Sequence, residues 1–162
     1  RDISVDCGVD ILSFGGTKNG LMMGESVLVF NPALKSEALY VRKQSAQLAS
    51  KLRYLSCQFT AYLTDHLWRK NALHANAMAQ KLYDALCAIP GIRFTQQMQS
   101  NQLFLTMPRA VIDSLLEDYF FYFWNEAENE IRLVTSFDTT DADVTSLASR
   151  ISQLMSLEEC PS

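Results

Sequence analysis

A lysine inside a glycine-rich segment is the first residue of this 162-residue chain that could do chemistry. Residues 13–20, SFGGTKNG, place Lys18 between two apolar runs at 9–14 and 26–30. This pattern predicts two strands joined by a tight loop that displays the lysine. Glycine permits left-handed backbone and close approach to a ligand, so the clustering of glycines indicates more than a surface turn. Four of the chain's six glycines belong to this stretch: Gly15, Gly16, Gly20 and Gly24.

Three interpretations compete for this segment. The first is an ordinary β-hairpin whose lysine is simply exposed. A phosphate-binding P-loop is excluded, because that motif needs Gly-Lys-Ser/Thr leading into a helix, whereas here Thr17 precedes Lys18 and a strand follows. The third is a lysine whose unprotonated amine forms a Schiff base with a carbonyl cofactor. In that case Ser13 and Thr17 are candidates for contacts to the phosphate or the ring of the cofactor.

Residues 13–20, together with GESVLVF at 24–30, resemble the cofactor-lysine segment of threonine aldolases. These enzymes belong to the aromatic amino acid β-eliminating lyase and threonine aldolase family, which uses pyridoxal 5′-phosphate (PLP). The resemblance covers essentially the whole chain. It implies an α/β fold of the PLP-dependent transferase class (fold type I, aspartate aminotransferase-like). It also favours Lys18 as the lysine that binds PLP over the simple hairpin.

Two further cations are implied as cofactor ligands by the same resemblance. In threonine aldolases a lysine and a later arginine follow the cofactor lysine and lie near the PLP phosphate or the mouth of the active site. Lys43 and Arg53 resemble that pair, and Lys51 is an equal claimant. Positive charge near the site suits a phosphate dianion. From the residues alone, most of the basic residues in this stretch are interpreted as a solvated helix face.

Arg132 lies inside an otherwise apolar strand predicted for residues 130–137. An arginine in such a strand is rarely buried without a partner. It therefore either points to solvent from the outer face or binds a carboxylate through two parallel hydrogen bonds. Residues 132–141, RLVTSFDTTD, again resemble the threonine aldolase family. There the arginine of the small C-terminal domain binds the α-carboxylate of the substrate, and the resemblance implies this role for Arg132.

The enzyme implied by the resemblance is a PLP-dependent carbon–carbon lyase. Members of the family cleave β-hydroxy-α-amino acids such as L-threonine or L-allo-threonine to glycine and an aldehyde. The implied ligands are therefore PLP and a small amino-acid substrate. Two alternatives stay open: a PLP-dependent β-eliminating lyase acting on aromatic or sulfur amino acids, and a non-catalytic α+β interaction domain whose lysine loop is incidental.

Two segments of the family pattern are not found in this sequence. Family members have an Asp-Gly-Ala-Arg type segment some tens of residues before the cofactor lysine, and a ring-stacking histidine earlier still. We therefore expect the chain to be the C-terminal half of a longer enzyme, inactive alone, which forms a homodimer or homotetramer once the N-terminal half is present. The expected domains are a large-domain remnant at 1–45, a long connecting helix at 46–75 and a small α+β domain at 76–162.

The composition favours a globular protein, with 48% hydrophobic and 20% charged residues. A net charge of −4 without a basic stripe argues against nucleic acid as a partner, and no apolar run approaches the ~20 residues of a membrane span. The cysteines form no Cys-x-x-Cys pair, so no metal site is expected, and buried reduced thiols in a cytoplasmic protein are favoured. The four cysteines are Cys7, Cys57, Cys87 and Cys160.

Periodicity predicts the remaining elements. Apolar residues at intervals of three and four predict one long helix from 34 to 71, with a break near 69–71, and a second helix from 74 to 89. The part of the chain after Pro90 is predicted to be a compact α+β unit. Its predicted elements are strands at 92–94, 102–107, 119–124 and 130–137, a helix that starts at Pro108, and a C-terminal helix capped by Thr140.

Overall fold

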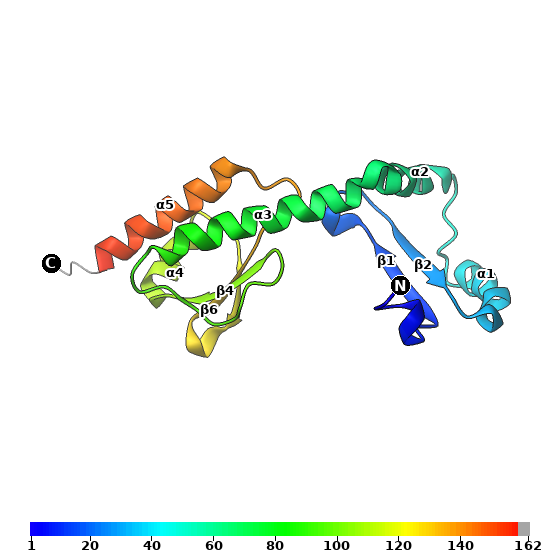
Figure 1. Cartoon of the computed structure of the whole chain (residues 1–162), viewed down its shortest axis with the longest axis horizontal. Helices are drawn as coiled ribbons and strands as arrows, with labels where there is room; N and C mark the ends of the chain where they lie inside the picture. The colour runs from blue at the N-terminus through cyan, green and yellow to red at the C-terminus, as the bar shows by residue number, and fades with distance from the viewer. Residues whose placement is uncertain (159–162) are drawn as a thin grey trace. The chain divides into compact units, whose positions relative to one another are not determined.

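The computed structural model describes residues 1–158 of the chain. The chain consists of two compact units, Arg1–Arg69 and Lys70–Ser162 (Figure 1). Each unit has its own sheet. The domain limits expected at residues 45 and 75 stay a prediction. Within the described residues, no helix is both long and apolar enough to cross a membrane.

The first unit is built on a two-stranded antiparallel hairpin. Strand β1, Ile11–Gly15, pairs with strand β2, Glu25–Val29, and Gly15 lies opposite Glu25 at the end that leads into the lysine loop. The predicted strand–loop–strand unit is therefore confirmed. The helices of this unit are α1, Lys35–Gln44, and α2, Arg53–Leu63, and its 3-10 turns are Val5–Cys7, Thr17–Asn19, Pro32–Leu34 and Thr64–His66.

The single long helix predicted for residues 34–71 is wrong. The backbone leaves the helical region between α1 and α2, where Ala46 and Lys51 have φ angles of 55° and 57°. The end of α2 has a local cause, because the hydroxyl of Thr64 donates to a backbone carbonyl one turn earlier at 2.7 Å and Thr64 itself is extended. Asp65 then has a φ of 50°. No glycine or proline marks these breaks, so the sequence pattern did not reveal them.

Helix α3, Leu67–Cys87, differs from the prediction in the opposite way, because it is continuous where a break was predicted. It continues through both the break predicted at 69–71 and the helix start predicted at His74. Its buried side chains do follow the predicted spacing, since Ala75, Met78 and Leu82 are at most 6% exposed. The apolar period therefore predicted the inward face correctly, and only the ends of the helix were wrong.

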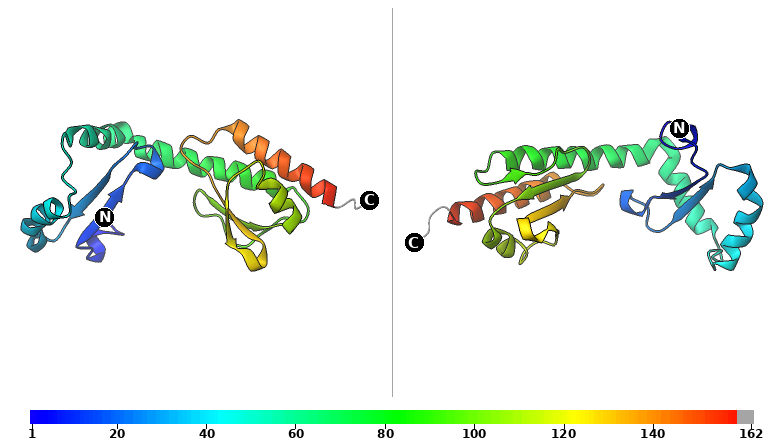
Figure 2. Two further views of the ribbon diagram at one scale, coloured as in Figure 1. Left: turned by 180° about the vertical axis from the view of Figure 1, so that it is seen from behind. Right: turned by 90° about the horizontal axis from the view of Figure 1, so that it is seen from below.

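The second unit is a four-stranded antiparallel sheet flanked by helices (Figure 2). The strands lie in the order β3-β4-β6-β5. Their bounds are β3, Arg93–Phe94; β4, Gln102–Thr106; β5, Tyr122–Asn125; and β6, Glu130–Val134. The helices after α3 are α4, Arg109–Leu115, and α5, Asp141–Glu158, and a 3-10 turn at Glu126–Glu128 joins β5 to β6. The α+β unit predicted after Pro90 is confirmed in its element order.

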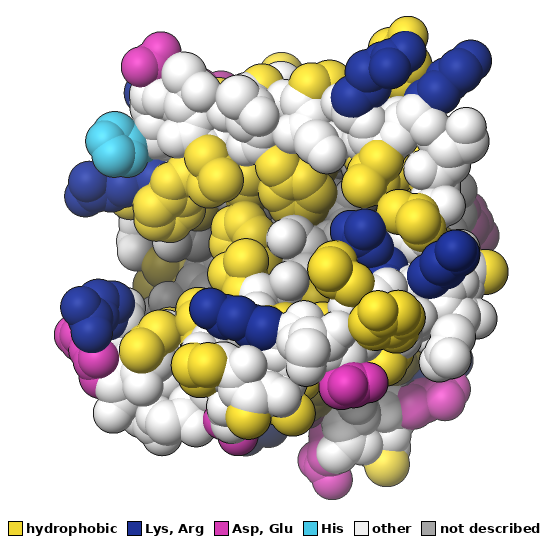
Figure 3. Space-filling model, turned by 90° about the vertical axis from the view of Figure 1, so that its right-hand side faces the viewer, with side chains coloured by type: hydrophobic (Ala, Val, Ile, Leu, Met, Phe, Trp, Pro, Cys, Tyr) yellow, Lys and Arg dark blue, Asp and Glu magenta, His cyan; other side chains and the backbone are white. Residues whose placement is uncertain are grey.

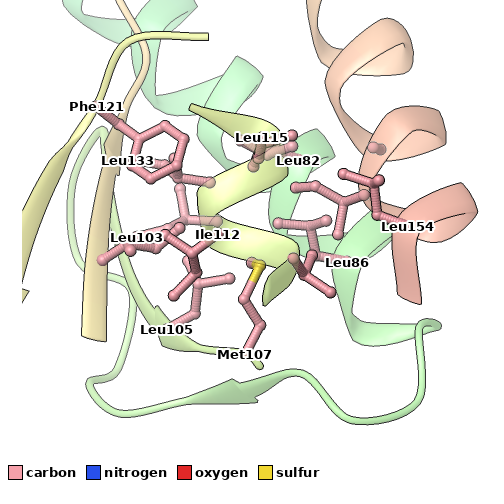
Figure 4. Packing of buried hydrophobic residues seen from close by; sticks show 14 of the residues in the cluster. Leu82, Leu86, Leu103, Leu105, Met107, Ile112, Leu115, Phe121, Leu133 and Leu154 are labelled. Carbon is pink, nitrogen blue, oxygen red and sulfur yellow. The ribbon is translucent and has the colours of Figure 1, made fainter. Parts of the chain in front are cut away.

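One face of this sheet carries the hydrophobic core (Figure 4). Helices α3, α4 and α5 all pack onto it. Side chains alternate between the two faces of a strand, so the residues between the buried ones lie on the opposite face. The buried strand residues are Leu103 and Leu105 of β4 and Ile131 and Leu133 of β6. The helix residues packed with them include Leu82, Leu86, Ile112, Leu115, Ile151 and Leu154.

The first unit buries far fewer side chains. Among residues 1–69, the large side chains that are buried are Leu21 and Tyr62. Hydrophobic side chains instead lie open on its surface beside lysine and arginine residues, as Figure 3 shows for one face. Ile3 and Met22, for example, are 92% and 91% exposed. The contacts within the first unit therefore account for little of the apolar surface that the described chain buries.

The prediction of buried cysteines is wrong for the described residues. Cys7, Cys57 and Cys87 are free thiols, and all three are exposed. Cys7 lies in a 3-10 turn that has no buried residue, and Cys87 is adjacent in α3 to Leu86, which takes the position that faces the core. Cys160 lies outside the described residues.

The N-terminus of α5 has the predicted cap. The hydroxyl of Thr140 accepts a hydrogen bond from the amide of Asp143 at 3.2 Å, and the carboxylate of Asp143 accepts from the amide and hydroxyl of Thr140 at 2.8 and 2.7 Å. This reciprocal arrangement satisfies amides that the helix leaves free. The Thr140 hydroxyl and amide, by donating to the carboxylate, lower the pKa of Asp143 below its ordinary value of 3.8.

We predict that Thr140→Ala lowers the free energy of unfolding by about 1 kcal/mol at pH 7, because the cap is lost. Thr145→Ala is the matched control, since its hydroxyl bonds to the carbonyl of Asp141 inside the same helix.

The cap also predicts a pH dependence. Because the pKa of Asp143 is lowered by folding, its stabilisation is present above pH 3.8 and is lost as the pH falls through its folded pKa. Urea unfolding of Asp143→Asn should therefore differ from the parent at pH 7 and converge with it in acid. Equal differences at both pH values would contradict this.

Candidate functional site

Lys18 lies in the 3-10 turn Thr17–Asn19 that connects β1 to β2. The turn is followed by Gly20, whose φ of 108° is in the left-handed region that favours glycine. Lys18 and Thr17 are both exposed. The turn therefore presents the lysine amine outward, where it is accessible to a carbonyl compound.

Helix α2 holds this loop in place through side chains. The Nδ2 of Asn19 donates to the hydroxyl of Tyr62 at 2.5 Å and to the carbonyl of Trp68 at 2.9 Å. On the other side of the turn, the Oε1 of Gln58 accepts hydrogen bonds from the backbone amides of Met22 and Met23 at 3.1 and 3.2 Å. The lysine is thus flanked by two anchors, both of which depend on the C-terminal half of α2.

Aromatic packing supports the same contact between the hairpin and α2. The ring of Phe14 lies 6.3 Å from that of Phe59 and 6.5 Å from that of Tyr62. Gly24, with a φ of 153°, lies so close to Phe59 that an added Cβ would be 2.8 Å from the ring. A Cβ on Gly16 would be 1.8 Å from the side chain of Leu21. These two glycines therefore allow close packing within the protein. The glycine-rich sequence alone could not distinguish this role from close approach to a ligand.

Ser13, predicted to contact the cofactor, has a partner inside the hairpin. Its hydroxyl donates to Oε1 of Glu25 at 2.7 Å. The same carboxylate covers Gly15, where an added Cβ would be 2.3 Å from an oxygen of Glu25. The contacts of Ser13 and Thr17 to a cofactor stay a prediction.

The described chain does not bring Lys43 or Arg53 next to Lys18. Helix α1, which carries Lys43, follows the end of β2 that is opposite to the lysine turn (Figure 1). Arg53 is the first residue of α2, five residues before Gln58 and nine before Tyr62, and thus roughly 7 and 13 Å along the helix from the two anchors of the loop. Lys51 lies just before α2. The assignment of these cations to the PLP phosphate stays a prediction.

Arg132 lies on strand β6 of the second unit, opposite Phe104 of β4 and Tyr122 of β5. Its neighbours Ile131 and Leu133 are 0% and 5% exposed and point into the core. Arg132 is therefore on the opposite face of the sheet, as the sequence pattern predicts. It is half-buried there.

The guanidinium of Arg132 has no anionic partner within the described residues. Its central carbon lies 5.4 Å from the centre of the Trp124 ring, and its Nε is buried without a hydrogen-bond partner. Glu130 is two residues earlier on the same face, but its carboxylate accepts a hydrogen bond from the hydroxyl of Thr95. A buried or half-buried arginine normally pairs with an anion. Arg132 is therefore a cation available to a carboxylate from outside the described chain.

Sequence reasoning missed Asn19, Gln58, Tyr62 and Trp124. Asn19 is adjacent to Lys18, so its position in the motif was the one available signal. The other three lie on elements whose contacts depend on the fold. Among residues 1–158, no group of three His, Cys, Asp or Glu side chains is placed to hold a metal ion.

Comparison with known proteins aligns the sequences of both units with the same kind of enzyme. The chain is 36% identical over 155 residues to a low-specificity L-threonine aldolase of Pseudomonas sp. (strain NCIMB 10558) and 35% identical over 154 residues to that of Pseudomonas aeruginosa. These alignments cover 96% and 95% of the chain. The threonine aldolase of Leishmania major matches 93% of it in structure, with a TM-score of 0.83 and 30% identity. Over almost its whole length, the chain is thus similar in sequence and in structure to part of the threonine aldolases.

The chain spans about 45% of the length of these relatives. No protein-family model matches it. Its fold is also similar to that of glycine decarboxylase (P-protein), with a TM-score of 0.53 and 17% identity over 89% of the chain. The predicted fold class, α/β of the PLP-dependent fold type I, is confirmed.

We predict that Gln58→Leu loosens the lysine loop, because the amides of Met22 and Met23 lose their acceptor. Loss of about 1 kcal/mol of hydrogen bonding corresponds to a roughly five-fold faster exchange of these amide protons. Hydrogen–deuterium exchange of the peptide that contains residues 16–24 measures this change in exchange rate. Thr60→Ala is the matched control, because its hydroxyl bonds within α2 to the carbonyl of Ser56. Unchanged exchange in Gln58→Leu would show that Gln58 does not anchor the loop.

Proposed function

We propose that the protein is a PLP-dependent lyase that cleaves L-threonine or L-allo-threonine type β-hydroxy-α-amino acids to glycine and an aldehyde. The observation that carries the proposal is the half-buried Arg132, whose Nε has no partner and which no carboxylate of the described residues neutralises. Such a cation is suited to the α-carboxylate of an amino acid. The similarity to low-specificity L-threonine aldolases supports the choice of reaction.

The residues of the lysine loop fit a cofactor that binds through a carbonyl group. Lys18 is exposed on a turn that Asn19 and Gln58 anchor, so the fold defines the position of the turn from which its amine extends. Lys18 would hold PLP covalently, with Ser13 and Thr17 as nearby polar groups and Lys43 and Arg53 as cations for its phosphate. When bound, PLP supplies the electron sink for cleavage of the bond between Cα and Cβ.

Arg132 contributes orientation. A guanidinium that binds a carboxylate through two parallel hydrogen bonds fixes the plane of that carboxylate. The substrate is thereby held with a defined rotation about its Cα, which determines which of its bonds is aligned for cleavage. A lysine at this position would keep the charge and lose the planar fork. The proposed role of Arg132 is thus binding and positioning, with no proton transfer.

The proposal includes the parts of the enzyme that this chain does not contain. Because the chain matches about 45% of the length of its relatives, we infer that it has no measurable aldolase turnover alone. The first unit buries few side chains, which supports a requirement for further polypeptide around the lysine loop. Assembly into a homodimer or homotetramer and a cytoplasmic location belong to the same proposal and rest on the resemblance to the family.

We predict that borohydride reduction of the PLP-loaded protein places a pyridoxyl group on Lys18, because a Schiff base is reduced to a stable amine. Peptide mapping by mass spectrometry identifies the site. Lys81, which is paired with Asp141, is the internal control and should stay unmodified. A pyridoxyl group on another lysine, with Lys18 unmodified, would remove Lys18 from the proposed site.

Replacing Arg132 with lysine should raise KM for L-threonine by about ten- to one hundred-fold, the equivalent of roughly 1.5–3 kcal/mol for a hydrogen bond to a charged group. Arg93→Lys is the matched control, because Arg93 is an exposed arginine on strand β3 of the same sheet. Products are assayed as glycine plus acetaldehyde. Formation of pyruvate and ammonia instead would indicate a β-eliminating lyase, and no turnover by the complete protein would contradict the proposed function.

A further inference from the structure

We propose that Trp124 is a positioning residue for Arg132, and through it a determinant of how tightly the enzyme holds the carboxylate of its amino-acid substrate. This inference rests on the proposed function and adds a residue to it. Trp124 lies on strand β5, next to the strand that carries Arg132. It is about half-exposed, so its ring is accessible from the open face of the sheet.

An irregularity in the sheet places the indole. Phe123 pairs with Ile131, and Asn125 pairs with Glu130, so Trp124 is an extra residue on β5 with no partner on β6. Such a β-bulge redirects the side chain of the unpaired residue and increases the local twist of the strand. The redirected indole packs edge-to-face against Phe104 of β4, with ring centres 5.0 Å apart and planes at 71°. Phe104 is itself opposite Arg132 in the sheet, so the three side chains form one cluster.

The cluster restrains the arginine without neutralising it. The π face of Trp124 lies 5.4 Å from the central carbon of the guanidinium, within the range of a cation–π interaction. An aromatic face attracts the cation and leaves its outer N–H groups free to donate. Arg109 shows the contrasting case, because it also lies over an aromatic ring, that of Phe123, but is paired with Asp113 and Glu126.

The nearest carboxylate on the same strand face is kept from Arg132 by another contact. Glu130 is 9% exposed and accepts a hydrogen bond from the hydroxyl of Thr95. If this carboxylate were to pair with Arg132, it would compete with the substrate. The aromatic contact therefore orients the guanidinium while its charge remains available.

The test compares Trp124→Leu and Trp124→Phe with the parent enzyme in the synthetic direction, from glycine and acetaldehyde. Trp124→Leu should raise KM for glycine by about two- to five-fold, the range expected when a cation–π contact is lost, and Trp124→Phe should lie between it and the parent. KM for acetaldehyde, which has no carboxylate, should stay unchanged, and kcat should change less than two-fold. A merely structural role would not separate the two substrates.

Phe120→Leu is the matched control, because Phe120 is 81% exposed, contacts Tyr122 and lies outside the cluster. A second readout does not depend on turnover. In protein labelled with 5-fluorotryptophan, the resonance missing from Trp124→Phe identifies Trp124, and glycine should shift it whereas glycinamide should not. The shift should disappear in Arg132→Lys.

The outcomes separate this inference from the proposed function. Equal KM increases for glycine and acetaldehyde, or unchanged KM values in Trp124→Leu, would overturn the role of Trp124 while leaving a working aldolase. An inactive complete protein would contradict the proposed function. In that case a glycine-dependent shift of the Trp124 resonance would still support carboxylate binding at Arg132, and its absence would overturn the inference as well.

Discussion

The contact between Arg132 and the ring of Trp124 is the interaction on which the proposed substrate site depends. A guanidinium can be oriented by a carboxylate or by an aromatic face, and the two differ in how much of its charge and how many of its N–H donors stay available to a ligand. A carboxylate neutralises the cation and occupies its donors, whereas an aromatic face holds the cation and leaves its charge to a ligand. Here the arginine lies over an indole, and the carboxylate of Glu130 is bonded to Thr95. The open face of the sheet thus presents one half-buried positive charge.

The hydrophobic core determines which face of the sheet carries that charge. Ile131 and Leu133 are almost fully buried on either side of Arg132, and Leu103 and Leu105 are buried opposite them on β4. A slip of one residue in the pairing of β6 would turn Arg132 into the core and two leucine-sized side chains toward solvent. Desolvating an unpaired guanidinium in that core would cost several kcal/mol. The same packing that stabilises the second unit therefore specifies the orientation of the arginine.

The sequence predicts the parts of this arrangement that depend on periodicity. Alternation in residues 130–137 placed Arg132 on the outer face, and the glycine-rich segment predicted the hairpin that carries Lys18. What the sequence did not predict depends on single residues and on contacts between distant elements. The bulge at Trp124 is one example, because the aromatic residues around it have the composition of an ordinary strand and give no sign of an extra residue. The breaks at Ala46, Lys51 and Asp65 occur without glycine or proline, and the stripe of apolar residues continues across them.

One of those breaks has a consequence for the lysine loop. Asn19 contacts the hydroxyl of Tyr62 in α2 and the carbonyl of Trp68 in α3 with the same amide group. In a straight helix, residues six positions apart are separated by roughly 120° around the axis and about 9 Å along it, so Tyr62 and Trp68 would face different sides of the helix. The left-handed residues Asp65 and His66 change the direction of the chain between them. Left-handed backbone at residues other than glycine is unfavourable, so the contacts around Asn19 are part of what stabilises the kink. The kink and the anchored loop depend on each other, and Lys18 takes its position from both.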